Sequence, residues 1–194
     1  MVDFQHTAAI TVDLEWCPDP VLRDTVSLLG EHDIPATLFS THDDGIVPTQ
    51  HERGLHPNFS DGDDEKAVLA ELSETHPSAR GIRSHGLQIS SPLRQYYEPH
   101  SLVYESNYMQ YLQTGCTPFC MLGEVVQFPI YFMDDFWLRS RKSETELPAI
   151  ERLLRREGLK VFGFHPVHIY LTTPSIEYYN RYKKDYQEPT ALRY

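Results

Sequence analysis

Short apolar runs alternate along the chain with segments in which apolar residues recur every three or four positions. Residues 8–12 (Ala-Ala-Ile-Thr-Val) are rich in β-branched side chains and predict a buried strand. Leu22, Val26 and Leu29 then recur at helical spacing, and Gly30 fits the end of that helix. Further strands are expected over 34–39, 52–55, 81–84, 102–105 and 159–164.

Helices are expected between most of these strands. Ser143 and Glu146 form a capping-box pattern that begins one helix, with Pro148 in the following turn. The region 114–135 is rich in aromatic residues, prolines and cysteines, and we expect short strands and loops there. Other helices are expected over 18–30, 65–73 and 175–186, with a helix or turn over 91–97.

Strands that alternate with helices are typical of an α/β domain, in which consecutive strands are parallel and joined by right-handed crossovers. We expect one domain over residues 1–194, because no repeat or linker divides the chain. The chain is shorter than a typical barrel of eight β/α units, so a smaller or incomplete barrel is the better prediction.

The charge and the apolar content of the chain limit the kinds of partner that the protein is expected to bind. The formal net charge is -11, which argues against nucleic acid and anionic membranes as partners. No apolar stretch approaches the roughly 20 residues that span a bilayer. The N-terminal residues also lack the pattern of a secretory signal, so a cytoplasmic protein is expected.

The three cysteines, Cys17, Cys116 and Cys120, are too few and too scattered for a disulfide framework. The last two could be read as half of a zinc site. There is no second pair, which excludes a structural site of four thiolates. Buried free thiols are expected instead.

Two carboxylates, Asp13 and Glu15, follow the first predicted strand. Alternate residues of a strand point to the same side, so both can face one site. One could then bind a divalent ion while the other serves as a base near the water on that ion. The alternative is a carboxylate pair that caps the next helix beside Pro18.

Histidines and an arginine follow other predicted strands: His56, Arg83, His85 and His165. The carboxyl ends of parallel strands meet at one edge, so these side chains are expected to converge. Two imidazoles and a carboxylate would form a catalytic metal site with an open position for water. Ordinary core or surface histidines are the alternative.

Arg83 could hold a carboxylate in its ionised form, or form a plain surface salt bridge. His165 is a candidate general acid, because the unperturbed imidazole pKa lies near neutrality. It could equally be a core histidine.

An acidic pair, Asp134 and Asp135, lies among aromatic residues and suits a sugar site. Trp137 could line the same site or belong to the core. His168, three residues after His165, is a further candidate for contact with substrate.

The order of these motifs resembles the polysaccharide deacetylase (NodB-like) superfamily, also called carbohydrate esterase family four. The likeness runs from about Ile10 to His168 and is strongest to the short WbmS-like branch, which is associated with O-antigen clusters. It implies a distorted (β/α)7 barrel. It also implies a divalent metal, with zinc expected, and a carbohydrate or other amide-bearing small molecule as substrate.

The resemblance also implies roles for residues. Asp13 would be the catalytic base and Glu15 a metal ligand, although the two could be exchanged. His56 matches the first of two metal histidines, but Ser60 occupies the place of the second. We infer from the residues themselves that His85, at the place of a family proline, supplies the missing ligand.

The remaining motifs match in order. Arg83 corresponds to the arginine that orients the base, and His165 to the acid histidine. The fourth motif is acidic and aromatic, like Asp134, Asp135 and Trp137.

These features together predict a metal-dependent hydrolase of C–N amide bonds, acting on the N-acetyl group of a sugar in surface polysaccharide biosynthesis. Two alternatives stay open. One is a metal- or carbohydrate-binding domain on the same fold without catalysis, which Ser60 favours. The other is an amidase with a substrate that is not a sugar.

Overall fold

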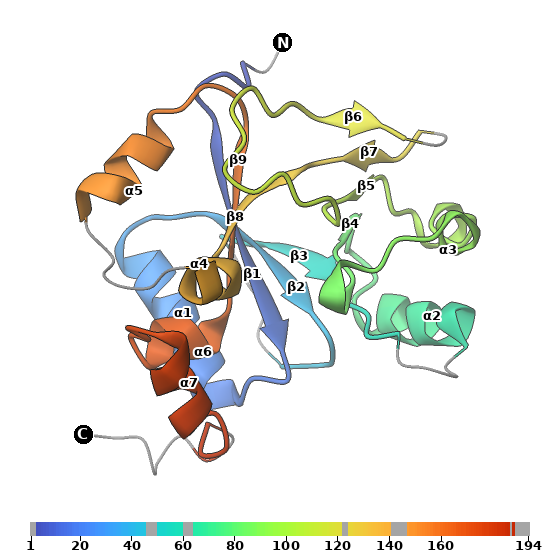
Figure 1. The fold of residues 1–194 in the computed structure, drawn as a ribbon. Helices are drawn as coiled ribbons and strands as arrows, with labels where there is room; N and C mark the ends of the chain where they lie inside the picture. The colour runs from blue at the N-terminus through green and yellow to red at the C-terminus, as the bar shows by residue number, and fades with distance from the viewer. Residues whose placement is uncertain are drawn as a thin grey trace.

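The computed structural model describes residues 3–45, 50–59, 64–121, 124–140, 147–186 and 188. Within these ranges the chain forms a mixed α/β structure around one curled sheet (Figure 1). Its strands are β1 (Ala8–Glu15), β2 (Ala36–Ser40), β3 (Glu52–Leu55), β4 (Gly81–Ile82), β5 (Tyr104–Glu105), β6 (Phe119–Cys120), β7 (Val126–Gln127), β8 (Ile130–Met133) and β9 (Lys160–Phe164). Its helices are α1 (Asp19–Glu31), α2 (Glu65–Thr75), α3 (Ser91–Arg94), α4 (Asp134–Ser140), α5 (Leu147–Leu154), α6 (Pro166–Tyr170) and α7 (Ile176–Tyr182), with 3₁₀ turns at His85–Leu87 and Glu98–His100.

The sheet order is β6-β7-β5-β4-β3-β2-β1-β9-β8, and the pairs are parallel except for β6 with β7. Only Phe128 and Pro129 separate β7, at one side, from β8, at the other. A parallel bridge between Met109 and Ile130 joins the chain after β5 to β8. The sheet therefore curls until its two sides meet, which agrees with the expected distorted seven-unit barrel.

The alternation of side chains in β1 separates an outer core from the barrel interior. Val12 and Leu14 point outward and pack against Leu22 and Leu29 of α1, with Leu38 of β2 in the same cluster. Thr11 and Asp13 consequently point inward. Because successive side chains of a strand point to opposite faces, the polar residues of β1 point into the barrel while their apolar neighbours are buried against α1.

A second core lies beneath α2 and α3, on the right in Figure 1. Leu69 and Leu72 of α2 pack there with Leu55 of β3, Ile82 of β4 and Leu93 of α3. Asp64 caps α2, because its side chain accepts hydrogen bonds from the backbone N–H groups of the first turn. This packing fixes the ends of β3 and β4, from which His56 and Arg83 follow.

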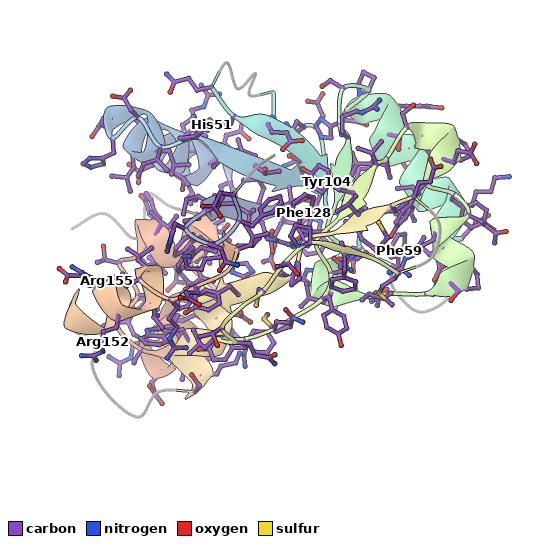
Figure 2. The ribbon with its side chains drawn as sticks, turned by 90° about the horizontal axis from the view of Figure 1, so that it is seen from above. His51, Phe59, Tyr104, Phe128, Arg152 and Arg155 are labelled. Atoms are coloured by element: carbon purple, nitrogen blue, oxygen red, sulfur yellow. The ribbon has the colours of Figure 1, made fainter. Side chains whose placement is uncertain are left out.

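The short strands β4 and β5 approach each other closely at Gly81. A Cβ atom at this position would lie 1.9 Å from the Tyr104 ring. Tyr104 in turn meets Phe128 edge to face, with ring centres 5.5 Å apart (Figure 2). Residue 81 is therefore a glycine because a side chain would clash with the Tyr104 ring, and not because of its backbone conformation.

Several sequence predictions need correction. Helices α4 and α6 were not expected, and α4 begins inside the region that predicted only strands and loops. Pro148 lies in the first turn of helix α5, where proline is tolerated. The capping-box residues Ser143 and Glu146 lie outside the described residues.

All three cysteines are free, as predicted, but only Cys17 and Cys116 are buried; Cys120 is exposed. Its place in the short hairpin strand β6 explains the difference. Among the helices described, none combines the length and the apolar character that crossing a membrane requires.

Candidate active site at the carboxyl ends of the strands

A buried ion pair between Asp13 and Arg83 lies inside the barrel. Arg83 Nη1 donates to Asp13 Oδ1 at 2.8 Å and to the Thr11 hydroxyl at 2.7 Å. Its Nε and Nη2 donate to the backbone oxygen and the hydroxyl of Ser106, at 3.0 and 2.8 Å. The guanidinium also lies 4.6 Å from the centre of the Phe39 ring. Arg83 is therefore held on all sides and can fix the orientation of Asp13.

The charge of Asp13 depends on this pair. Burial alone would raise the pKa of the carboxyl group, but the Arg83 guanidinium, His56 and His165 together outweigh this effect. The pKa of Asp13 is therefore below its usual value. A general base must be ionised to accept a proton, and Asp13 meets this requirement although it is buried inside the barrel.

Glu15 reaches the same site through an irregular backbone. The register of β1 against β2 shifts between Asp13 and Glu15, and Glu15 adopts a positive φ of 46°. The Thr41 hydroxyl donates to the Glu15 carbonyl and supports this conformation. Glu15 Oε1 then lies 3.3 Å from His85 Nδ1 and 3.7 Å from His165 Nε2. Strain of this kind collects at functional sites, where surrounding contacts hold it.

His56 is the unusual member of the group. Its side chain is buried, at 2% exposure, and neither ring nitrogen has a hydrogen-bond partner in the described part of the chain. Burial lowers the pKa of His56 to about 4, so the ring is neutral near pH 7. Its backbone N–H donates to Ser40 at 2.8 Å, which fixes its place after β3. A buried imidazole without partners carries a desolvation cost that a bound cation would remove.

Glu15, His56 and His85 form what we call the ligand cluster. One ligand atom from each lies within 4.8 Å of the others. The donor set, two imidazoles and one carboxylate, is a common zinc set that leaves a position for water. The unpaired nitrogens of His56 and this donor chemistry together fit a divalent cation.

His165 faces the ligand cluster from β9 and is paired with Asp134 at the start of α4. Its Nδ1 lies 2.6 Å from Asp134 Oδ1, and its backbone N–H donates to Asp134 Oδ2 at 2.8 Å. Burial would lower the pKa of His165, but Asp134 and the nearby acids raise it to about 10. The ring is therefore protonated at neutral pH, rather than close to its midpoint as the sequence suggested.

Of the four predicted substrate contacts, Asp134, Asp135 and His168 lie near His165, with different surroundings. Both oxygens of Asp134 bind His165, which makes Asp134 a residue that orients the histidine. The Asp135 carboxylate lies 3.9 Å from Arg139, and burial raises its pKa. His168 packs against Tyr179, with ring centres 4.7 Å apart.

Trp137 packs on the core residue Phe132, at 5.5 Å between ring centres, so its core interpretation gains support. The contacts of Asp135, Trp137 and His168 with substrate stay predictions. Asp134, His165 and His168 also form a second group whose ligand atoms lie within 4.8 Å, but the pairing of the first two already occupies it.

Sequence reasoning missed the residues that hold Arg83. Thr11 could have been found, because it alternates with Asp13 on the same face of β1. Ser106 follows the two-residue strand β5, and nothing in its neighbourhood signals a role. Ser60, at the place of the family's second metal histidine, lies outside the described residues.

Comparisons with known proteins agree with this fold. The family model described as WbmS-like polysaccharide deacetylase matches residues 10–183. The crystal structure of a Bordetella bronchiseptica protein, described as a polysaccharide deacetylase involved in O-antigen biosynthesis, has a TM-score of 0.84 at 25% identity. The match covers 97% of this chain and 83% of that chain. No curated protein matches the chain.

More distant structures share the fold. A family 4 carbohydrate esterase from Streptomyces lividans, solved with acetate, has a TM-score of 0.52 at 13% identity, over 98% of this chain and 91% of that one. A family 4 pseudoenzyme from Bacillus anthracis has a TM-score of 0.54 at 12% identity, over 96% of this chain and 62% of that one.

Proposed function

Because this chain belongs to the WbmS-like polysaccharide deacetylase family, we propose that it is a metal-dependent hydrolase that removes the N-acetyl group from an acetamido sugar. The observation that carries the proposal is the buried His56, whose ring nitrogens have no hydrogen-bond partner in the described part of the chain and which lies beside Glu15 and His85. The similarity to the Bordetella protein favours a role in O-antigen biosynthesis.

Glu15, His56 and His85 would hold the cation, and zinc suits this donor set best. A zinc ion bound there would lower the pKa of its water and polarise the carbonyl of the acetamido group. The chain's own residues supply the proton transfers.

Asp13 acts as the general base. Its Oδ1 stays bound to Arg83, and its Oδ2 accepts a proton as the water oxygen attacks the carbonyl carbon. Arg83 keeps the carboxylate ionised and prevents its rotation. Because Arg83 is itself fixed by Thr11 and Ser106, the base needs little reorganisation at the moment of attack.

His165 acts as the general acid. The C–N bond breaks as His165 donates the proton on Nε2 to the leaving amine, and acetate is released from the acyl side. Asp134 holds Nδ1 and keeps the ring protonated before the transfer. Base and acid thus approach the amide from β1 and from β9.

A binding domain without catalysis is the second candidate, and Ser60 at the place of the second metal histidine favours it. In that case the ligand cluster would bind metal or sugar, but no acetate would form. This alternative predicts metal content without turnover.

The test measures metal content by elemental analysis and acetate release from acetamido sugars. We expect one zinc per chain and release of acetate by the native protein. Asp13→Asn should retain the metal and lose turnover by about 10²–10⁴-fold, whereas Glu15→Gln should lose the metal as well. Undiminished turnover by Asp13→Asn would contradict the mechanism, and metal without any acetate would favour the binding domain.

A further inference from the structure

A cavity of about 660 Å³ lies at the edge of the sheet opposite the ligand cluster. Its lining includes the residues just before β4, β5 and β7, whereas the ligand cluster follows the carboxyl ends of the strands. Helix α3 and the turn after it supply another part of the wall, on the right in Figure 1. The volume is that of a small-molecule site. We call this space the Arg94 cavity; the lining residues that matter are Arg80, Arg94, Glu98, Leu102, Glu124 and Val125.

Arg94, the last residue of α3, brings a buried positive charge to the wall. Its side chain is only 7% exposed. Nη2 donates to the Glu105 carboxylate and, at 3.3 Å, to Met121 Sδ. Nε has no hydrogen-bond partner among the described residues. A buried N–H group without an acceptor carries a desolvation cost, which an oxygen atom of a ligand would remove.

The other charged residues of the cavity are exposed and of both signs. In the described part of the chain, Arg80, Glu98 and Glu124 form no ion pair and no side-chain hydrogen bond. Opposite charges therefore line one space without reaching each other. A ligand with one negative and one positive group could pair with both kinds, whereas the glutamates would repel a dianion and the arginines a dication.

Part of the wall is apolar. Leu102 is buried and Val125 is partly buried, and both pack in the core beneath α2 and α3. Methylene groups of a ligand would be removed from water against these side chains. The wall therefore fits a short aliphatic molecule that carries a carboxylate and an ammonium group.

Hydrogen bonds connect Arg94 with Arg83. Glu105, which accepts from Arg94, also accepts from Asn107 Nδ2 at 3.4 Å. Asn107 Oδ1 accepts from the backbone N–H of the residue after Arg83 at 2.7 Å. Ser106, between Glu105 and Asn107, holds the Arg83 guanidinium. A ligand that restrains Arg94 would therefore also restrain the segment that fixes Arg83.

We infer that the Arg94 cavity is an effector site for a short aliphatic zwitterion. The carboxylate of the ligand pairs with the two arginines of the cavity, and its ammonium group pairs with the two glutamates. The bound ligand restrains Arg94 and, through Glu105, the setting of Arg83. This site lies apart from the ligand cluster and does not depend on the proposed function.

Calorimetric titration of the full chain tests the ligand class. The probes are ω-amino acids from glycine to 8-aminooctanoate, with hexanoate and hexylamine as matched molecules that each lack one charge. We expect the best ω-amino acid to bind once per chain and about 10-fold more tightly than either single-charge probe, equivalent to about 1.4 kcal/mol. No binding by any ω-amino acid, or equal binding of hexanoate or hexylamine, would overturn the site.

Variants at exposed lining positions locate the binding. Arg80→Gln and Glu124→Gln should each weaken binding of the best ω-amino acid by about 10-fold, because each removes one partner of the ligand. Arg23→Gln removes an exposed arginine of α1, far along the chain from the cavity residues, and should leave binding unchanged. Unchanged binding in both lining variants would place the ligand elsewhere and contradict the inference.

An NMR measurement tests the connection to Arg83. The Arg83 Nε–H group donates to the Ser106 carbonyl at 3.0 Å, and its signal is assigned by its absence in Arg83→Lys. Saturating ligand should shift this signal in the native protein, but not in Arg80→Gln at the same ligand concentration. Binding without a shift would overturn the effector role. Neither readout needs turnover, so failure here is distinct from failure of the proposed hydrolase.

Discussion

Two buried regions at the carboxyl ends of the strands differ in how fully their polar atoms are paired. The Arg83 atoms Nε, Nη1 and Nη2 all donate hydrogen bonds, to Asp13, Thr11 or Ser106. His56 is equally buried but has no hydrogen-bond partner in the described residues. The paired region is built to hold a charge in place, whereas the unpaired histidine is suited to receive a ligand. Unmet hydrogen-bonding capacity among the described residues, rather than burial, separates the proposed metal ligand His56 from the proposed positioning residue Arg83.

The largest effect is expected from removing one partner of the paired region. Arg83→Met leaves the Asp13 carboxylate buried without a counter-charge, which costs about 3–5 kcal/mol of unfolding free energy. Chemical denaturation measures it. Arg23→Met is the control, because its pair with Asp19 is exposed and 3.8 Å long, and it should cost less than about 1 kcal/mol. Equal losses in the two variants would mean that Arg83 does not compensate a buried charge.

Substitution of His56, in the unpaired region, should have the opposite effect on the stability of the metal-free protein. His56→Phe removes two unsatisfied nitrogens, so the metal-free protein should be as stable as the native one or more stable. The variant should also lose the rise in Tm that zinc produces, which is equivalent to about 2.7 kcal/mol at a zinc concentration 100 times Kd. Thermal denaturation with and without zinc tests both. A strong loss of stability in the metal-free variant would show that His56 has a structural role.

Asp134→Asn tests whether the second pair at the site is a positioning pair. Loss of the Asp134 charge should lower the pKa of His165 from about 10 by about 1–3 units. NMR titration of the metal-free protein measures the shift. His165 has a raised pKa in the folded state, so its stabilising contribution is complete below the unfolded pKa and lost as pH rises through about 10. In the variant this decline should be smaller and complete at lower pH; an unchanged His165 titration would contradict the pairing.

The smallest effect is expected at the edge of the paired region. Ser106→Ala removes the hydroxyl that accepts from Arg83 Nη2 and donates to the Phe128 carbonyl, but it leaves the backbone carbonyl that holds Nε. A loss of about 1–2 kcal/mol in unfolding free energy is expected by denaturation, with the Asp13–Arg83 pair retained. A loss as large as that of Arg83→Met would mean that the hydroxyl, and not the ion pair, organises this region.

The fold was largely predictable because its signals are local. Strand β3 covers the expected residues 52–55, and α1 nearly coincides with the expected helix. Helices α4 and α6 were missed because they have only 7 and 5 residues, too few to display a helical period. Helix α4 begins directly after β8, and helix α6 begins shortly after β9. In the sequence, each of these helices therefore looks like a continuation of the preceding strand.

The sequence predicted which residues lie at the candidate site, but it did not predict which of them form hydrogen bonds or ion pairs with one another. The positions of Asp13, Arg83 and His165 after apolar runs indicated one edge of a sheet. The partner of His165 was not predicted, because Asp134 is 31 residues away and its aromatic neighbours suggested a sugar site. The raised pKa of His165 follows from this pairing and could not be read from the residue alone.

By itself, the sequence determined the alternation of strands and helices and the set of ionisable residues at the strand ends, because both follow from spacing within short segments. Tertiary structure alone decided which carboxylate meets Arg83 and which histidine, among the described residues, stays without a hydrogen-bond partner. Those outcomes depend on the curl of the sheet and on the irregular backbone at Glu15, which bring together residues as far apart in the chain as Glu15 and His165.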